Sequence, residues 1–229
     1  MVRRHLSASA IVLLLAASPA SLPHFDPAPP GGVVQRQTVY LSGEGMSSRW
    51  TAVLSKRFVG RANEEPVYQW YLSIYAPPQG SNAKLALQTP GTSALLSKVT
   101  KAPDAQMYFP LQSAQIAGAA ELEHSGVQDL VFASHESGAD CGTATVTVFG
   151  ADRNGHVQTR AQFTNYCSLE ARIVRDGALQ AVQLRGPYYK ANSPVCCPAK
   201  PSAAAMLRYR SGRWILTPAI FPRASVRPL

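Results

Sequence analysis

Four cysteines set the first chemical question that the sequence raises: Cys141, Cys167, Cys196 and Cys197. An even number of cysteines in an exported chain predicts disulfide bonds, and four cysteines allow three pairings between which spacing does not choose. The rivals are a zinc site made of four thiolates and a catalytic cysteine. A zinc site of that kind usually contains two Cys-x-x-Cys pairs, and the sequence has none.

Catalytic motifs are missing from the rest of the chain. His135 precedes Cys141 in the stretch SHESGADC, which matches no cysteine-protease or transpeptidase signature. There is no Gly-x-Ser-x-Gly elbow, no His-Glu-x-x-His motif and no Walker loop, so we expect no catalytic residue and a non-enzymatic protein. The alternative is an unrecognised periplasmic hydrolase that uses carboxylates near the segment 121–140. Those carboxylates would come from Glu121, Glu123, Glu136 and Asp140, and the sequence selects no pair.

One stretch resembles a known calcium loop. Residues Ala120 to Val131 read AELEHSGVQDLV. This resembles the loop of FG-GAP and integrin-propeller repeats, which reads A-D-x-D-x-D-G-x-x-D-L-V. The resemblance implies that alternate carboxylates fold around Ca²⁺, that Gly126 makes the sharp turn, and that Asp129 closes the site before a strand.

Three ligand positions depart from that pattern. Glu121 and Glu123 replace aspartates, which moves each carboxylate outward by one methylene, and Ser125 removes a charge. We therefore expect a turn that keeps the shape and has lost the ion, with no metal ligand and no cofactor. Glu121, Glu123 and Asp129 would be the ligands if calcium does bind. Only one such loop occurs, so the sequence does not indicate a propeller of many blades.

A second resemblance covers roughly the last hundred residues. It is carried by Tyr188-Tyr189, by Cys196-Cys197-Pro198, and by LRYR followed by GRW between Leu207 and Trp214. These features resemble the tail of small exported bacterial envelope proteins of the LppP/LprE lipoprotein kind, although the chain lacks their lipidated cysteine. The resemblance implies location and fold more than an activity.

The segments that must position these residues alternate between apolar and polar side chains. Val67–Ala76 follows the period of two that is typical of a half-buried strand, and Arg49–Phe58 fits a strand better than a helix. Ser93–Lys101 has apolar residues at helical spacing and is the best candidate for a short helix. The sequence thus predicts an all-β fold with at most one or two short helices.

Three predicted two-residue turns organise the C-terminal half: Asn154-Gly155, Asp176-Gly177 and Ser211-Gly212. Such pairs supply the positive φ angles that hairpin turns require. Each turn brings apolar residues opposite one another, and three hairpins in a row predict an antiparallel meander that forms a sandwich or a partly open barrel. The predicted facing pairs are Val148 with Ala161, Leu169 with Leu184, and Leu207 with Leu216.

The meander also gathers the cysteines. It places the three turns at one pole and all four cysteines at the opposite pole, where residues distant in the sequence can meet. The first hairpin puts Cys167 opposite Gly142, so a direct bridge to Cys141 would need a bulge. We expect all four cysteines to be oxidised, and long-range pairing with Cys196 and Cys197 is favoured over a bridge between these two neighbours.

The N-terminus has the layout of a secretory signal peptide. Arg3 and Arg4 precede the apolar run Ala8–Ala17, and Ser18-Pro19-Ala20 fits a cleavage site. The run is about half of the ~20 residues that cross a bilayer. We expect a signal peptide over 1–20, a disordered Pro/Gly-rich lead-in over 21–32, and one β-rich domain over 33–229. A sub-boundary is possible near 105–115, and the location is periplasmic or secreted.

Composition narrows the choice of partners. The 229 residues include 22 Lys+Arg and 13 Asp+Glu, for a net charge of +9, and only 15% of residues are charged, against about 25% in an average protein. This composition excludes a coiled coil and a collagen-like chain. The basic residues are scattered and form no nucleic-acid motif. We expect an anionic envelope polymer or a protein partner, no nucleic acid, and no membrane span in the mature chain.

Overall fold

The computed structural model describes residues 23–41, 49–62, 65–90, 111–123, 125–136, 142–152, 154–190 and 198–222. Over these ranges the chain forms thirteen strands and no helix, which confirms the predicted all-β class. Within the same ranges there is accordingly no helix that could cross a membrane. The candidate helix Ser93–Lys101 lies outside them.

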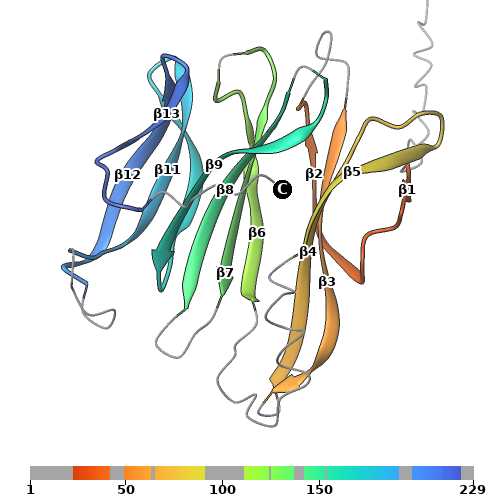
Figure 1. The fold of residues 1–229 in the computed structure, drawn as a ribbon, viewed down its shortest axis with the longest axis horizontal. Helices are drawn as coiled ribbons and strands as arrows, with labels where there is room; N and C mark the ends of the chain where they lie inside the picture. Colours follow the sequence, from red (N-terminus) through yellow and green to blue (C-terminus); the bar gives the residue numbers. More distant parts are fainter. Residues whose placement is uncertain are drawn as a thin grey trace, which may run out of the picture.

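Three sheets follow one another along the chain (Figure 1). The first sheet has the order β1-β5-β4-β3-β2, and all of its pairings are antiparallel except the parallel pair β1–β5. Its strands are β1 (His24–Asp26), β2 (Gly32–Val39), β3 (Trp50–Ala62), β4 (Glu65–Tyr75) and β5 (Asn82–Pro90).

The second and third sheets are simple antiparallel meanders in which each strand pairs with the next. The second contains β6 (Leu111–Ala120), β7 (Asp129–Glu136), β8 (Thr143–Ala151) and β9 (Val157–Tyr166). The third contains β10 (Glu170–Asp176), β11 (Leu179–Tyr188), β12 (Lys200–Arg210) and β13 (Arg213–Thr217). None of the three closes into a barrel, so the fold is a sandwich extended by a third layer.

The second sheet is the middle layer of this stack and contributes buried residues to an apolar cluster on each of its faces. Along β7, Leu130 and Phe132 join the apolar cluster shared with the first sheet, whereas Val131 and Ala133 join the cluster shared with the third. Strand β6 contacts both neighbouring sheets, because it lies against β2 of the first sheet and β10 of the third. The outer faces of the first and third sheets are therefore the two broad faces of the molecule.

The structure corrects the prediction of one continuous C-terminal meander. The strands themselves lie close to the predicted ranges, but β9 and β10 do not pair: the chain leaves the second sheet after Tyr166 and enters the third at Glu170. Cys167, in this connection, has a φ of +66°. Alternation along a strand shows which residues are buried but does not show which sheet the strand joins. The sequence pattern therefore could not reveal that the chain changes sheets here.

One predicted register is wrong by two residues. The loop between β10 and β11 is Gly177-Ala178, one residue later than the predicted Asp176-Gly177, and Leu184 faces Ala171 instead of Leu169. Gly177 has a φ of +67° at the first loop position, where a type II′ turn needs glycine. A shift of two residues keeps every side chain on its face, so the predicted core face is still correct.

The other two predicted registers are confirmed. Leu207 pairs with Leu216 across the Ser211-Gly212 turn, and Val148 pairs with Ala161. The predicted two-residue turn Asn154-Gly155 is wrong, however, because β8 ends at Ala151 and β9 begins at Val157, which leaves a longer loop between them. Between Val148 and the loop, however, a bulge in β9 leaves Arg160 as the extra residue. A bulge redirects the side chain of the bulged residue, and this one matters for the site described below.

The predicted disordered lead-in is wrong for its described part. Residues His24–Asp26 form β1, which pairs in parallel with β5 and packs Phe25 on Tyr75 with ring centroids 4.4 Å apart. Phe25 is buried. The proline- and glycine-rich composition of this segment predicted disorder and gave no weight to Phe25, whose burial fixes the strand.

Candidate functional site

Cys167 is the cysteine that lies within the described residues. It follows β9, its backbone N–H donates to the carbonyl oxygen of Gly142 at 3.1 Å, and its Sγ lies 3.1 Å from the hydroxyl oxygen of Tyr189. The predicted position opposite Gly142 is thus confirmed. Cys141, Cys196 and Cys197 lie outside the described ranges, and the pairing of the four cysteines stays a prediction.

A cavity of about 340 Å³ lies beside Cys167, between the second and third sheets. Its lining includes His135 and Glu170. The described carboxylates considered for a hydrolase lie elsewhere: Asp129 begins β7 and His135 lies near its end, a separation of about 20 Å at the usual rise of a strand. The described part of the chain therefore does not gather the carboxylates of the 121–140 segment around this histidine. Asp140 and the side chain of Glu136 are outside the description.

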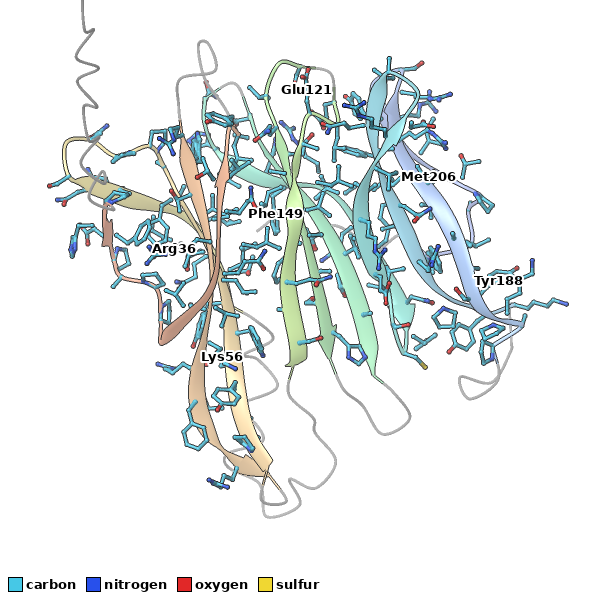
Figure 2. The ribbon with its side chains drawn as sticks, turned by 180° about the vertical axis from the view of Figure 1, so that it is seen from behind. Arg36, Lys56, Glu121, Phe149, Tyr188 and Met206 are labelled. Carbon is cyan, nitrogen blue, oxygen red and sulfur yellow. The ribbon has the colours of Figure 1, made fainter. Side chains whose placement is uncertain are left out.

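The calcium-like turn between β6 and β7 keeps part of the expected geometry. Glu121, at the tip of the turn (Figure 2), accepts a hydrogen bond from the backbone N–H of Gly126 at 2.8 Å, and Gly126 has a φ of +79°. Glu121 is exposed, Glu123 is half-buried, and Asp129 is buried. The three predicted weak candidates therefore share one turn but lie at three different depths.

Arg160 places a positive charge among these carboxylates. Its Nε lies 3.8 Å from Oε1 of Glu123, and its Nη2 donates to the carbonyl oxygen of Ala151. Burial, with the nearby charge of Glu123, raises the pKa of Asp129 to about 7, against the lowering effect of Arg160 and of two backbone N–H groups of the turn. The bulge in β9 thus brings a guanidinium close to Glu123 and Asp129, two of the three predicted weak candidates.

A second charged feature covers the outer face of the third sheet. The inner face of this sheet carries the core residues Ala171, Leu184 and Leu207, so the residues between them point outward. Five arginines have this outward position in the register: Arg172, Arg185, Arg208, Arg210 and Arg213. We call this surface the arginine face. Figure 2 shows Met206, which has the same parity, on this sheet at one end of the molecule.

Carboxylates neutralise only part of the arginine face. Asp176 accepts two hydrogen bonds from Arg208, from its Nε and, at 3.2 Å, from its Nη2, and these bonds hold the pKa of Asp176 below its usual value. Arg210 lies 3.9 Å from the same carboxylate. Within the described chain Arg172, Arg185 and Arg213 form no ion pair with a carboxylate. The face therefore keeps a net positive charge.

In the free protein, the arginine face brings like charges close together and exposes apolar side chains. Arg210 and Arg213 lie directly opposite one another across β12 and β13, and like charges in that position destabilise a sheet. Leu179 and Ile215 lie on the same face and are 44% and 38% exposed. A surface that combines unpaired guanidinium groups with exposed apolar side chains is suited to an anionic partner that also offers apolar contact.

Sequence reasoning missed the arginine face because it looked for runs of basic residues. The usable signal is the period of two, since Arg208 and Arg210 share parity on one strand. The correct turn then places Arg172 and Arg185 on the same side.

Comparison with known proteins finds no family model, no curated protein and no solved structure that matches this chain.

Proposed function

We propose that the protein is a non-enzymatic, exported β domain that binds an anionic envelope polymer on its arginine face. The observation that carries the proposal is the set of five arginines on one face of a sheet, of which four are exposed and three form no ion pair with a described carboxylate. A guanidinium binds carboxylate or phosphate oxygens through two parallel hydrogen bonds, so it suits polymers that repeat either group.

A charged face that extends over four strands favours a polymer over a small molecule. Successive outward residues on a strand are about 7 Å apart and neighbouring strands about 4.8 Å apart, so the arginines offer contacts at intervals comparable to the repeat of a sugar or phosphate chain. Leu179 and Ile215, between them, can contact the apolar faces of sugar rings. The hydrolase alternative has no comparable support, because the described carboxylates of the segment 121–140 do not converge on His135.

The test compares two pairs of substitutions that remove the same charge. The double variant Arg172→Gln/Arg185→Gln removes two guanidinium groups from the arginine face. The control variant Arg57→Gln/Lys84→Gln removes two exposed charges from the first sheet. Binding is measured by calorimetry with polygalacturonate, with polyphosphate and with neutral dextran, at low and at physiological salt.

We expect the arginine-face variant to bind at least one of the two polyanions about tenfold more weakly than the wild type, and the control variant to lose less than twofold. Dextran should not bind, and affinity should fall with salt. Equal losses in the two variants would mean that net charge alone is responsible, and would overturn the proposal. So would binding to neither polyanion, or a polymer that becomes shorter during incubation, which would favour the hydrolase.

A further inference from the structure

A pocket of about 510 Å³ lies at the opposite end of the stack, on the outer face of the first sheet. It is bounded by β1, by the middle of β2, by the start of β3 and by the turn between β4 and β5. Arg36, labelled in Figure 2, is on this sheet, and Met206 of the arginine face is at the far side of the molecule. The pocket and the arginine face are therefore separate surfaces.

The wall formed by β1 is held by several contacts. The backbone N–H of His24 donates to the carbonyl oxygen of Ser81 at 2.8 Å, and Phe25 packs on the Tyr75 ring. The hydroxyl of Tyr75 donates to the carbonyl oxygen of Pro27, also at 2.8 Å. The pocket thus has one wall anchored at each end, as a preformed site requires.

The charge of the pocket is positive and unbalanced. Arg36 and Arg49 line it, and among the described residues of the lining there is no carboxylate. In the part of the chain that the structure describes, neither arginine forms an ion pair. The guanidinium of Arg36 lies over the Phe25 ring, 5.3 Å from its centroid. Stacking on an aromatic ring fixes the plane of the guanidinium and leaves its N–H donors at the edge available for an anion.

Hydroxyl groups complete the lining. Thr38 and Thr51 pair directly across β2 and β3 and both line the pocket, as does Ser81. These groups can donate to or accept from the hydroxyls of a sugar or another polyol. The volume is within the range of sites that hold one small molecule.

We infer that this pocket binds a small anionic ligand of sugar size, with its phosphate or carboxylate group on Arg36 and Arg49 and its hydroxyls on the two threonines. Phosphate and carboxylate share the chemistry that the two guanidinium groups recognise, and the probes separate them. The inference does not depend on the polymer proposed for the arginine face.

The experiment titrates the wild-type protein with glucose 1-phosphate, with glucuronate and with glucose, and follows backbone amide shifts by NMR. We expect at least one charged sugar to bind with shifts confined to residues of β1, β2 and the start of β3, and glucose to bind at least tenfold more weakly. Arg36→Gln should weaken binding about tenfold or more. Arg36→Lys, which keeps the charge and loses the fork of donors, should weaken it severalfold.

Two control variants make the result specific. Lys84→Gln removes one exposed charge from the same sheet outside the pocket, and Arg172→Gln/Arg185→Gln alters only the arginine face; both should keep wild-type affinity. The amide spectrum of each variant checks its fold. The inference is overturned if neither charged sugar binds at 10 mM (roughly the weakest binding of interest), if glucose binds equally well, or if Arg36→Gln and Lys84→Gln lower affinity equally.

Discussion

Asp129 is a buried carboxylate whose protonation is coupled to folding. Burial raises its pKa to about 7, whereas an aspartate in an unfolded chain has a value near 3.8. The folded state therefore binds more protons than the unfolded state between these two values. The free energy of unfolding therefore falls as the pH rises from about 3.8 to about 7, and the full destabilisation by Asp129 is present above pH 7.

The substitution Asp129→Asn should remove this pH dependence. A shift of this size corresponds to about 4 kcal/mol, so the wild type should lose a substantial part of that amount between pH 5 and pH 8. The variant should gain stability relative to the wild type at pH 8. Urea unfolding at both pH values measures the difference. An unchanged pH dependence in the variant would show that Asp129 is ionised in the folded protein throughout.

Gly186 is a residue whose identity the packing dictates. A Cβ at this position would lie 2.5 Å from the carbonyl oxygen of Ser168 and 2.9 Å from Nδ2 of Asn165. That amide donates to the carbonyl oxygens of Ser168 and Pro187, so the contact lies at the junction between the second and third sheets. Backbone atoms cannot rotate away as a flexible side chain can.

Gly186→Ala should therefore destabilise the protein by about 3 kcal/mol. Gly32→Ala is the matched control, because its Cβ would meet only one atom, at 4.0 Å, and its φ is outside the left-handed region. Chemical unfolding of the two variants measures the difference. Equal stability of both would mean that the junction between the sheets is looser than these distances indicate.

At the level of elements, the hairpins show what local sequence determines. The turn Ser211-Gly212 combines φ angles of +50° and +77°, and its predicted register is correct because only a type I′ turn fits both residues. At Gly177 one glycine allows two placements of the loop, and the predicted one was a residue too early. A single positive-φ residue identifies a hairpin without fixing its loop.

The layers and the sites depend on tertiary contacts that no local pattern contains. The change of sheet at Cys167 is not marked by proline or by a long polar loop, and the short strand around Phe25 is stabilised by β5, far along the chain. The arginine face could have been derived from strand parity. The pocket of Arg36 could not, because it depends on where β1 packs.

The cysteine pole provides a prediction at the level of the connections between strands. All four cysteines of exported protein should be oxidised, with a long-range bridge from the segment around Cys196 and Cys197. Closing a loop of roughly 30 to 60 residues stabilises a protein by about 3.5–4.5 kcal/mol when strain is absent. Peptide mapping without reductant, with a cut between Cys196 and Cys197, identifies the partners. Thiols that react with an alkylating reagent would contradict the prediction and restore the zinc and catalytic alternatives.

At the level of the whole molecule, the two exposed broad faces differ in character. The arginine face extends over four strands, whereas the outer face of the first sheet has a bounded pocket with an aromatic wall. The middle sheet separates them by two sheet spacings, about 20 Å. One face is suited to an extended anion and the other to a compact one, which is why the two proposals call for different probes and different variants.

The middle sheet has a further consequence. Antiparallel sheets commonly keep one side in water, but the middle sheet contributes residues to apolar clusters on both of its sides. Detaching either outer sheet would expose the apolar face of the middle sheet to water. The free energy of such partial opening should therefore be close to that of complete unfolding. Limited proteolysis should therefore leave either the intact three-sheet protein or fully digested chain, and no stable fragment that consists of two sheets.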